Sequence, residues 1–257
     1  MSHHHLVLKI TNVIFYLFFL GTGVYDLSTG STPDVIERHA SFFAPADWVQ
    51  YAWILTYILL GGFVVYEFFE GGHETAIHGV GWFFPVAVLL NTVWFDTWKY
   101  GWGLLSWFSI LIVAGFISFI YHNLTKNHPI TGWADALFVH APFSLWHGWV
   151  VFFAVVNTFA TFTHLKDEPS TLDIILVILG LLFLTSTAVG YAEYKRGDVA
   201  GALVIAWGLY AVFARQTNPV IHWASLAAAI ISTLYPAKPY VLKLLGRRTE
   251  EQAPLLG

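Results

Sequence analysis

The chain has no cysteine and few charged residues. Without cysteine, disulfides and thiol chemistry are excluded. Charged residues make up 11% of the 257 residues, against about 25% in a typical soluble protein. Hydrophobic residues make up 57%, which is more apolar surface than such a chain can hide from water. The net charge is −4 and there is no run of basic residues, so the sequence argues against a nucleic-acid partner.

The apolar residues instead come in helix-length blocks, not in the alternating ten-residue segments of an outer-membrane barrel. We therefore expect an all-α protein, a polytopic membrane bundle whose main partner is the lipid bilayer. It has about eight transmembrane helices, or seven spans if the last pair, which is short, does not cross fully. The expected spans are Leu6–Tyr25, Trp48–Phe69, Gly79–Tyr100, Gly103–Tyr121, Ala136–Thr163, Leu172–Tyr191, Val199–Ala214 and Pro219–Tyr235. A cleaved signal peptide ending near Gly21 and Gly23 is the rival interpretation of the first span.

We interpret residues 1–257 as a single transmembrane domain, with a five-helix core (1–163), additional helices (164–237) and a tail (238–257). An even number of spans places both termini on one side, and eight of the 12 lysine and arginine residues fall on that side. The positive-inside rule then predicts cytoplasmic termini. Glu251, Leu255 and Leu256 match the loose pattern of an acidic dileucine signal, which would direct the protein to an endosome or vacuole. The oligomeric state stays open, a homodimer included.

Three expected spans carry polar and aromatic residues at depth. A span that only dissolves in lipid needs about 20 apolar residues and nothing else, so these groups suggest a face turned towards protein or a cavity. The bland alternatives are interfacial belts and helix packing for the tryptophans, and interhelical hydrogen bonding for the asparagines. The residues concerned are Trp53 and Tyr57, then Asn91, Trp94 and Trp98, and finally Pro142, Trp146, Trp149 and Asn157.

The spacing of these residues resembles that of a known family. The second span has proline, tryptophan and then tyrosine four residues on, at Pro45, Trp53 and Tyr57, and the third has an asparagine-x-x-tryptophan motif. The fifth reads APFSLWHGWVVFFAVVN. Together they resemble the tryptophan-rich sensory protein and translocator-protein family, also called peripheral benzodiazepine receptors. A fourth block around Trp207 resembles an extended bacterial branch with helices after the five-helix core, so the similarity covers about residues 40–215.

The resemblance implies a five-helix core with a cavity for a porphyrin-like or sterol-like ligand. A porphyrin or haem is accordingly the cofactor to consider, and the hydrophobic small molecule is the expected partner. The main hypothesis is a membrane binding, transport or sensory protein for a planar hydrophobic ligand. The candidate wall residues are Trp53, Tyr57, Asn91, Trp94, Trp98, Pro142, Trp146, Trp149 and Asn157.

The alternative hypothesis is a membrane-embedded enzyme acting on a lipid or isoprenoid. Asp96, Glu67 and His147 are its candidate acids and bases, and Asp96 and Glu67 would need to face one cavity. The simpler interpretation of Asp96 is an interfacial pair with Lys99, three residues away.

Other chemistries find little support in the sequence. His140 and His147, seven residues apart, are candidate axial ligands to a haem-type iron, with hydrogen-bonded structural histidines as the alternative. We find no metal-binding motif, no phosphate loop and no recognisable nucleophile arrangement. Every lysine lies near a span end or in a loop, which excludes Schiff-base chemistry inside the bundle. The sequence therefore favours binding over catalysis without deciding between them.

Overall fold

The computed structural model describes residues 3–29, 37–163, 168–193 and 197–244. Within these ranges the protein is helical and contains no strand, as expected. The first half contains α1 (His3–Thr29), the short 3₁₀ segment η1 (Asp47–Tyr51), α3 (Ala52–Tyr66), α4 (Glu70–Glu74), the π-helix η2 (Thr75–Val80), α5 (Phe83–Lys99) and α6 (Gly103–Asn127). The second half contains α7 (Trp133–Asp135), the π-helix η3 (Ala136–His140), α8 (Ala141–Phe162), α9 (Thr171–Glu193), α10 (Val199–Arg215) and α11 (Pro219–Leu244).

All eight predicted spans coincide with helices of the structure. Six helices in the described residues are long and apolar enough to cross a membrane on their own, and there are seven if a bent pair counts as one span. The remaining helix, α10, has 17 residues, which at 1.5 Å per residue falls slightly short of a bilayer core of about 30 Å. The fold is thus a polytopic helical membrane bundle.

Two spans differ from the expectation. The third span is not one straight helix, because η2 and α5 meet at an angle of 60°. Gly81 lies at this break with φ of +55°, a conformation that other residues adopt only with strain. The eighth span is long enough to cross, since the apolar part of α11 runs over 20 residues to Lys238. Only α10 is short.

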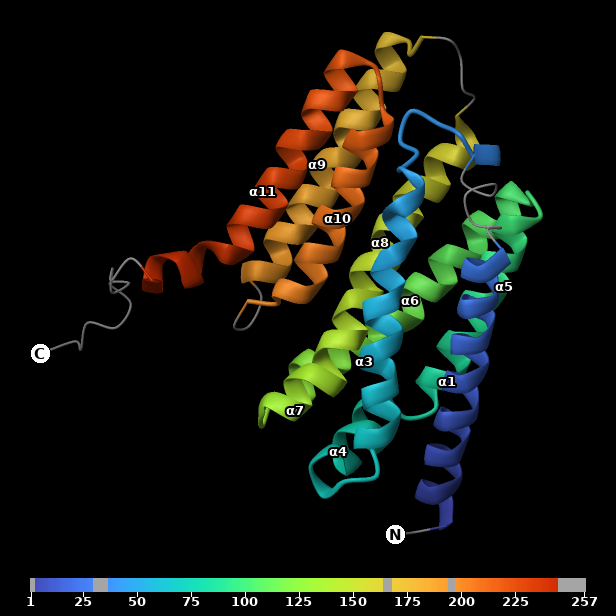
Figure 1. Ribbon diagram of the computed structural model, residues 1–257, viewed down its shortest axis with the longest axis vertical. Helices are drawn as coiled ribbons and strands as arrows, with labels where there is room; N and C mark the ends of the chain where they lie inside the picture. Colours follow the sequence, from blue (N-terminus) through green and yellow to red (C-terminus); the bar gives the residue numbers. More distant parts are fainter. Residues whose placement is uncertain (1–2, 30–36, 164–167, 194–196, 245–257) are drawn as a thin grey trace, which may run out of the picture.

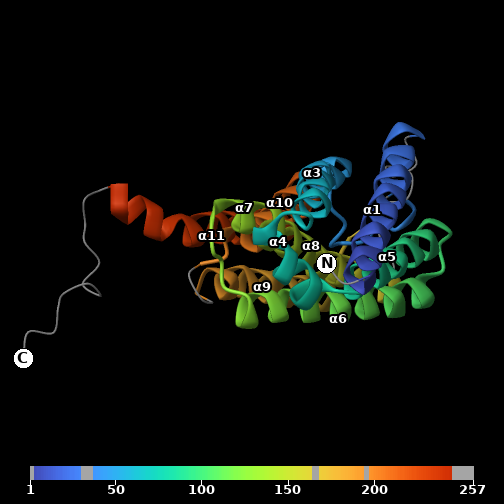
Figure 2. The same cartoon turned by 90° about the horizontal axis from the view of Figure 1, so that it is seen from below.

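The helix α8 occupies the centre of the bundle. Within its most apolar window 67% of the residues are buried, against 22% in α1 and in α9. It carries apolar, aromatic and small residues around its whole circumference, which is typical of a helix enclosed by others. Its neighbours are α3 and α6 on the side of the N-terminal half and α10 on the other side. Figure 2 shows α1 and α5 at one end of the molecule and α11 at the other.

The three C-terminal helices pack against one another and reach α8 mainly through α10 (Figure 1). This crossing is close because glycines face it. A Cβ added to Gly148 of α8 would lie 2.4 Å from Val204 Cγ1 and 2.6 Å from the carbonyl oxygen of Gly201. Small residues at such crossings let helix backbones approach closely. The van der Waals contacts made in this way are a main source of packing energy in lipid.

Polar contacts at the same crossing also fix the position of α10 relative to α8. Asp198 caps α10 by accepting hydrogen bonds from the backbone N–H groups of Ala200 and Gly201, at 3.0 and 3.3 Å. Its other carboxylate oxygen accepts a hydrogen bond from the hydroxyl of Ser144 on α8. The helix cap and the interhelical contact therefore share one side chain, which sets where α10 begins relative to α8.

The α8–α10 crossing predicts a sharp difference between two glycine substitutions. Gly148→Ala should destabilise the protein by about 1–3 kcal/mol, because the new methyl group meets backbone that cannot move aside. Gly115→Ala on α6 should be neutral or stabilising, since nothing lies within 4 Å of its added Cβ. Thermal unfolding of both variants in detergent measures the difference. Equal unfolding temperatures would contradict the close crossing.

Candidate functional site

A cavity of about 630 Å³ lies between α1, α3 with η1, α5 and α8. Most of its wall is aromatic or aliphatic, and polar groups are concentrated near the ends of α1 and α5. Aromatic side chains from all four helices contribute flat apolar surfaces. These side chains are Phe18, Phe19, Tyr25, Trp53, Tyr57, Trp94, Phe95, Trp98, Trp149 and Phe153.

Six of the nine predicted wall residues line this cavity. Trp53 and Tyr57 come from α3, and Trp149 comes from α8. The α5 residues Asn91, Trp94 and Trp98 line it as well. They lie on one stripe of the helix because intervals of three, four and seven residues return to the same face. The structure thus brings residues from three predicted spans to one place, and whether they bind a ligand stays a prediction.

Trp146 lies directly behind the wall. It is fully buried, and its indole N–H donates a hydrogen bond of 3.1 Å to Asn91 Oδ1. This bond fixes the orientation of the Asn91 amide, with the oxygen towards Trp146. The Asn91 nitrogen has no partner among the described residues, so it is the group that Asn91 offers to the cavity. Trp146 therefore positions a cavity residue without lining the cavity itself.

Pro142 and Asn157 are not among the residues that line the cavity. Pro142 is buried at the start of α8. Asn157 donates a hydrogen bond of 2.9 Å to Ser106 Oγ on α6. Eight residues of α-helix turn the chain by about 80° beyond two full turns, which carries Asn157 away from Trp149 and towards α6. Asn157 thus connects two helices, which is the alternative role weighed for it from the sequence.

The fourth wall, α1, was not predicted from the sequence. Phe19 of α1 stacks on Trp146, with ring centroids 5.2 Å apart. Gly23 permits close contact with α3, because a Cβ there would lie 2.3 Å from the Tyr57 hydroxyl. Tyr16 donates a hydrogen bond of 3.1 Å to the carbonyl oxygen of Tyr57. The available signal was the pair Gly21 and Gly23, which also fits a signal-peptide cleavage site.

One end of the cavity carries charges. Lys99 at the end of α5 pairs with Asp26 of α1, with 3.2 Å between Nζ and Oδ1. Lys99 was expected to pair with Asp96 on the same helix. No direct ion pair joins them in the described structure, although the charge of Lys99 still acts on the Asp96 carboxylate. Asp96 is among the residues that line the cavity, and it is exposed. The ion pair ties α1 to α5, and Asp96 adds an acid beside it.

The three candidate catalytic residues lie in three different places. Glu67 is buried at the other end of α1, where Asn12 Nδ2 donates a hydrogen bond of 2.9 Å to its carboxylate. Lys9 donates to the backbone carbonyl of Glu67. The 17 residues from Lys9 to Asp26 span about 25 Å of helix, so Glu67 and Asp96 do not share a cavity.

His147 is also remote from the cavity wall. It lies between α6 and α9, where its ring nitrogens contact Ser118 Oγ at 2.8 Å and the Tyr191 hydroxyl. Its ring stacks on Tyr121, with centroids 4.6 Å apart. His140 lies 3.8 Å from Asp135. The described residues contain no group of three or more His, Cys, Asp or Glu side chains that could hold a metal ion.

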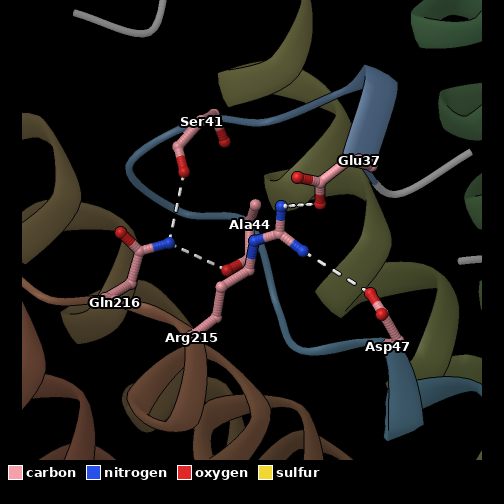
Figure 3. A network of polar contacts seen from close by, with 6 residues as sticks. All are labelled: Glu37, Ser41, Ala44, Asp47, Arg215 and Gln216. Carbon is pink, nitrogen blue, oxygen red and sulfur yellow. Dashed lines mark hydrogen bonds and ion pairs between the residues drawn. The ribbon is translucent and has the colours of Figure 1, made fainter. Parts of the chain in front are cut away.

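The connector from 37 to 46 lies near the charged end of the cavity and is held by two residues at the end of α10. Arg215 of α10 contacts Glu37 at 2.6 Å and Asp47 at 3.5 Å. Gln216 donates hydrogen bonds to the carbonyl oxygens of Ser41 and Ala44, at 3.2 and 2.9 Å (Figure 3). The C-terminal helices therefore hold the chain that leads from α1 to α3.

On the cavity side of this connector, His39 stacks on the wall residue Trp98. Their ring centroids are 3.8 Å apart, and His39 Nε2 lies 2.7 Å from the carbonyl oxygen of Trp98. Burial lowers the pKa of His39 from its usual value, and the nearby charge of Arg38 acts in the same direction, while the hydrogen bond to Trp98 opposes them. His39 is therefore held neutral against Trp98.

This contact predicts a pH dependence of stability. The unfolded chain binds a proton at His39 more readily than the folded protein, so the free energy of unfolding should fall as the pH drops below about 6.5. In His39→Gln this contribution should vanish, and the loss of stability between pH 7.5 and 5.5 should be smaller than in the wild type. Thermal unfolding at the two pH values measures it. The exposed His122→Gln is the matched control, and an unchanged slope in His39→Gln would contradict the assignment.

The fold and the cavity together define a class, a polytopic helical membrane protein with an aromatic-walled cavity between its helices. The model of the TSPO-like protein family matches residues 7–236. The chain therefore belongs to the TSPO-like protein family, which confirms the resemblance found in the sequence. The match extends beyond residues 40–215 and includes most of α1 and α11. No curated protein and no solved structure matches the chain.

Proposed function

We propose that this protein binds a planar hydrophobic molecule of porphyrin or sterol type in the cavity between α1, α3, α5 and α8, for transport or sensing. The observation that supports this most directly is the cavity itself. Its volume of about 630 Å³ lies within the range of about 300–1,000 Å³ that is usual for small-molecule sites. Membership of the TSPO-like family agrees with the proposal.

The chemistry of the wall supports a flat apolar ligand. Removing apolar surface from water contributes about 25 cal/mol per Å², and indole rings offer large rigid faces for this contact. Trp94 and Trp149 are themselves 3% and 5% exposed, so packing holds their rings in place, while the half-buried Trp53 and Tyr57 expose more ring surface to a ligand. The free amide nitrogen of Asn91 supplies a hydrogen bond that orients the ligand.

The helix α1 is the wall through which exchange of the ligand is easiest. It is one of the two least buried spans and stands at the edge of the bundle (Figure 2). Its polar contacts to other helices lie near its ends, at Lys9 and Asn12 and at Asp26, and in its middle, at Tyr16. The part of α1 that lines the cavity lies between the contacts of Tyr16 and Asp26, and a small displacement of this part would open the cavity without breaking them.

The cavity predicts which tryptophans matter for binding. Trp149→Leu should weaken the binding of protoporphyrin dimethyl ester, a neutral planar probe, by about tenfold or more, because a wall of the cavity is lost. Trp223→Leu, which replaces an exposed residue of α11, should bind like the wild type. The absorption spectrum of the porphyrin measures binding without relying on tryptophan fluorescence. Equal affinities of the two variants, or no binding by the wild type, would refute the proposed site.

The alternative role, an enzyme that uses Asp96, Glu67 and His147 as acids and bases, receives less support. Only Asp96 lines the cavity, while Glu67 and His147 are buried elsewhere with partners of their own. Acid–base catalysis requires its groups within hydrogen-bond reach of one substrate. Asp96 alone does not meet this requirement.

For the orientation, we propose that both termini face the cytoplasm, with a homodimer as an open possibility. The excess of lysine and arginine on the side of the termini supports this orientation. The acidic dileucine pattern at Glu251, Leu255 and Leu256 lies outside the described residues, and a location in an endosomal or vacuolar membrane rests on this pattern alone.

The absence of cysteine makes the orientation simple to test, because any introduced cysteine is the only one. In sealed vesicles with the cytoplasmic face outward, Glu251→Cys should react with a membrane-impermeant maleimide. Thr217→Cys, in the exposed turn between α10 and α11, should react only after detergent is added. The reverse pattern would show that the termini lie on the other side.

A further inference from the structure

The charged end of the cavity indicates which charge the ligand carries, whereas the apolar walls do not. Three of the residues that line the cavity have charged side chains, namely Asp26, Asp96 and Lys99. Lys99 is bound to Asp26 at 3.2 Å, so these two charges largely cancel. The carboxylate of Asp96 has no ion-pair or hydrogen-bond partner among the described residues. The cavity rim is therefore negative by one charge.

We propose that the ligand is a hydrophobic cation, a flat apolar molecule with a protonated amine or quaternary ammonium group that lies beside Asp96. This inference rests on the proposed function, since it names the kind of ligand that the same cavity takes. Paired in this way, the ligand would neutralise the rim at a place where the surrounding helices and lipid reduce the screening by water. The apolar body would then fill the space between the indole rings.

In the described part of the chain, Lys99 is the cation whose charge acts on Asp96. The chain from Leu27 to Glu37 contains no lysine or arginine. Arg215 is held by Glu37 and Asp47. His39 is the titratable group that packs on Trp98, and burial lowers its pKa, which keeps it neutral. Arg38 is exposed and has no ion pair in the described part of the chain.

The aromatic walls suit a cation as well as an apolar body. The face of an indole or phenol ring is negative and attracts a positive group within about 6 Å. One such contact is already present at this end, where Lys99 Nζ lies 5.9 Å from the centre of the Tyr25 ring. Phe95 lines the cavity and is adjacent to Asp96 in the sequence, so its ring is the one of α5 nearest to an amine beside Asp96. Trp94 and Trp98, two residues away on either side, face about 160° from Asp96 around the helix.

An anionic ligand fits this end less well. A ligand carboxylate could pair with Lys99 only by displacing Asp26, and it would then lie close to two aspartates. Displacing Asp26 would also release the contact that ties α1 to α5. Like charges held together in a partly buried site repel strongly. The rim therefore selects against a diacid porphyrin and in favour of an amine.

The test compares three porphyrins that share one ring system, namely protoporphyrin as the free diacid, its dimethyl ester, and its diamide with protonated amine side arms. Affinities are measured for the full-length protein in a non-ionic detergent. The wild type should bind the amine about tenfold more tightly than the ester, and the diacid more weakly than the ester. In Asp96→Asn the preference for the amine should fall to about twofold or less, with binding of the ester retained. Glu168→Gln removes an exposed charge near the connector but outside the cavity, and should keep the wild-type preference.

The outcomes separate this inference from the proposed function. Equal binding of amine and ester by the wild type, or a preference that survives in Asp96→Asn, overturns the cationic ligand and leaves the cavity as a binding site. A preference for the diacid overturns it as well. If none of the three porphyrins binds, the proposed function fails and the inference fails with it. Added salt should weaken the binding of the amine more than that of the ester.

Discussion

The cavity depends on how α1 is held against the rest of the bundle. In lipid, apolar helices gain little from leaving their surroundings, so specific contacts decide where they pack. Polar contacts hold α1 near its two ends, through Lys9 and Asn12 to Glu67 and through Asp26 to Lys99, and in its middle through Tyr16 to the carbonyl oxygen of Tyr57. Between them, Gly23 lets Tyr57 approach. This arrangement makes the C-terminal half of α1 one wall of the cavity.

Different faces of the central helix α8 contact the two halves of the molecule. One face supplies Trp149 and Phe153 to the cavity. Another face, at Gly148, receives α10 at close range. The C-terminal helices also hold the connector beside the cavity through Arg215 and Gln216 (Figure 3). Helices that lie outside the cavity thus stabilise the loop that packs on Trp98, which gives them a part in shaping the site.

Much of the fold could be predicted from the sequence because span length and hydropathy act locally. Eight spans were expected, and each coincides with a helix, although at most seven of these are long and apolar enough to cross a membrane. The stripe of Asn91, Trp94 and Trp98 follows from helical periodicity alone. The bend at Gly81 was missed because a π-helix leaves no clear periodic signal. Asn157 was predicted to line the cavity, but it is not among the lining residues. An angle of about 80° around the helix separates it from Trp149 and turns it towards α6.

The sequence by itself determined that the protein is a helical membrane bundle, which helices carry the aromatic residues, and which family the motifs resemble. Composition, length and spacing settle these points because each depends on residues close together in the chain. Only the tertiary structure decided that α1 closes the cavity, that Lys99 pairs with Asp26 and not with Asp96, and that Glu67 and His147 lie elsewhere. These facts depend on the rotation and register of helices that are distant in sequence, and hydropathy carries no information about either.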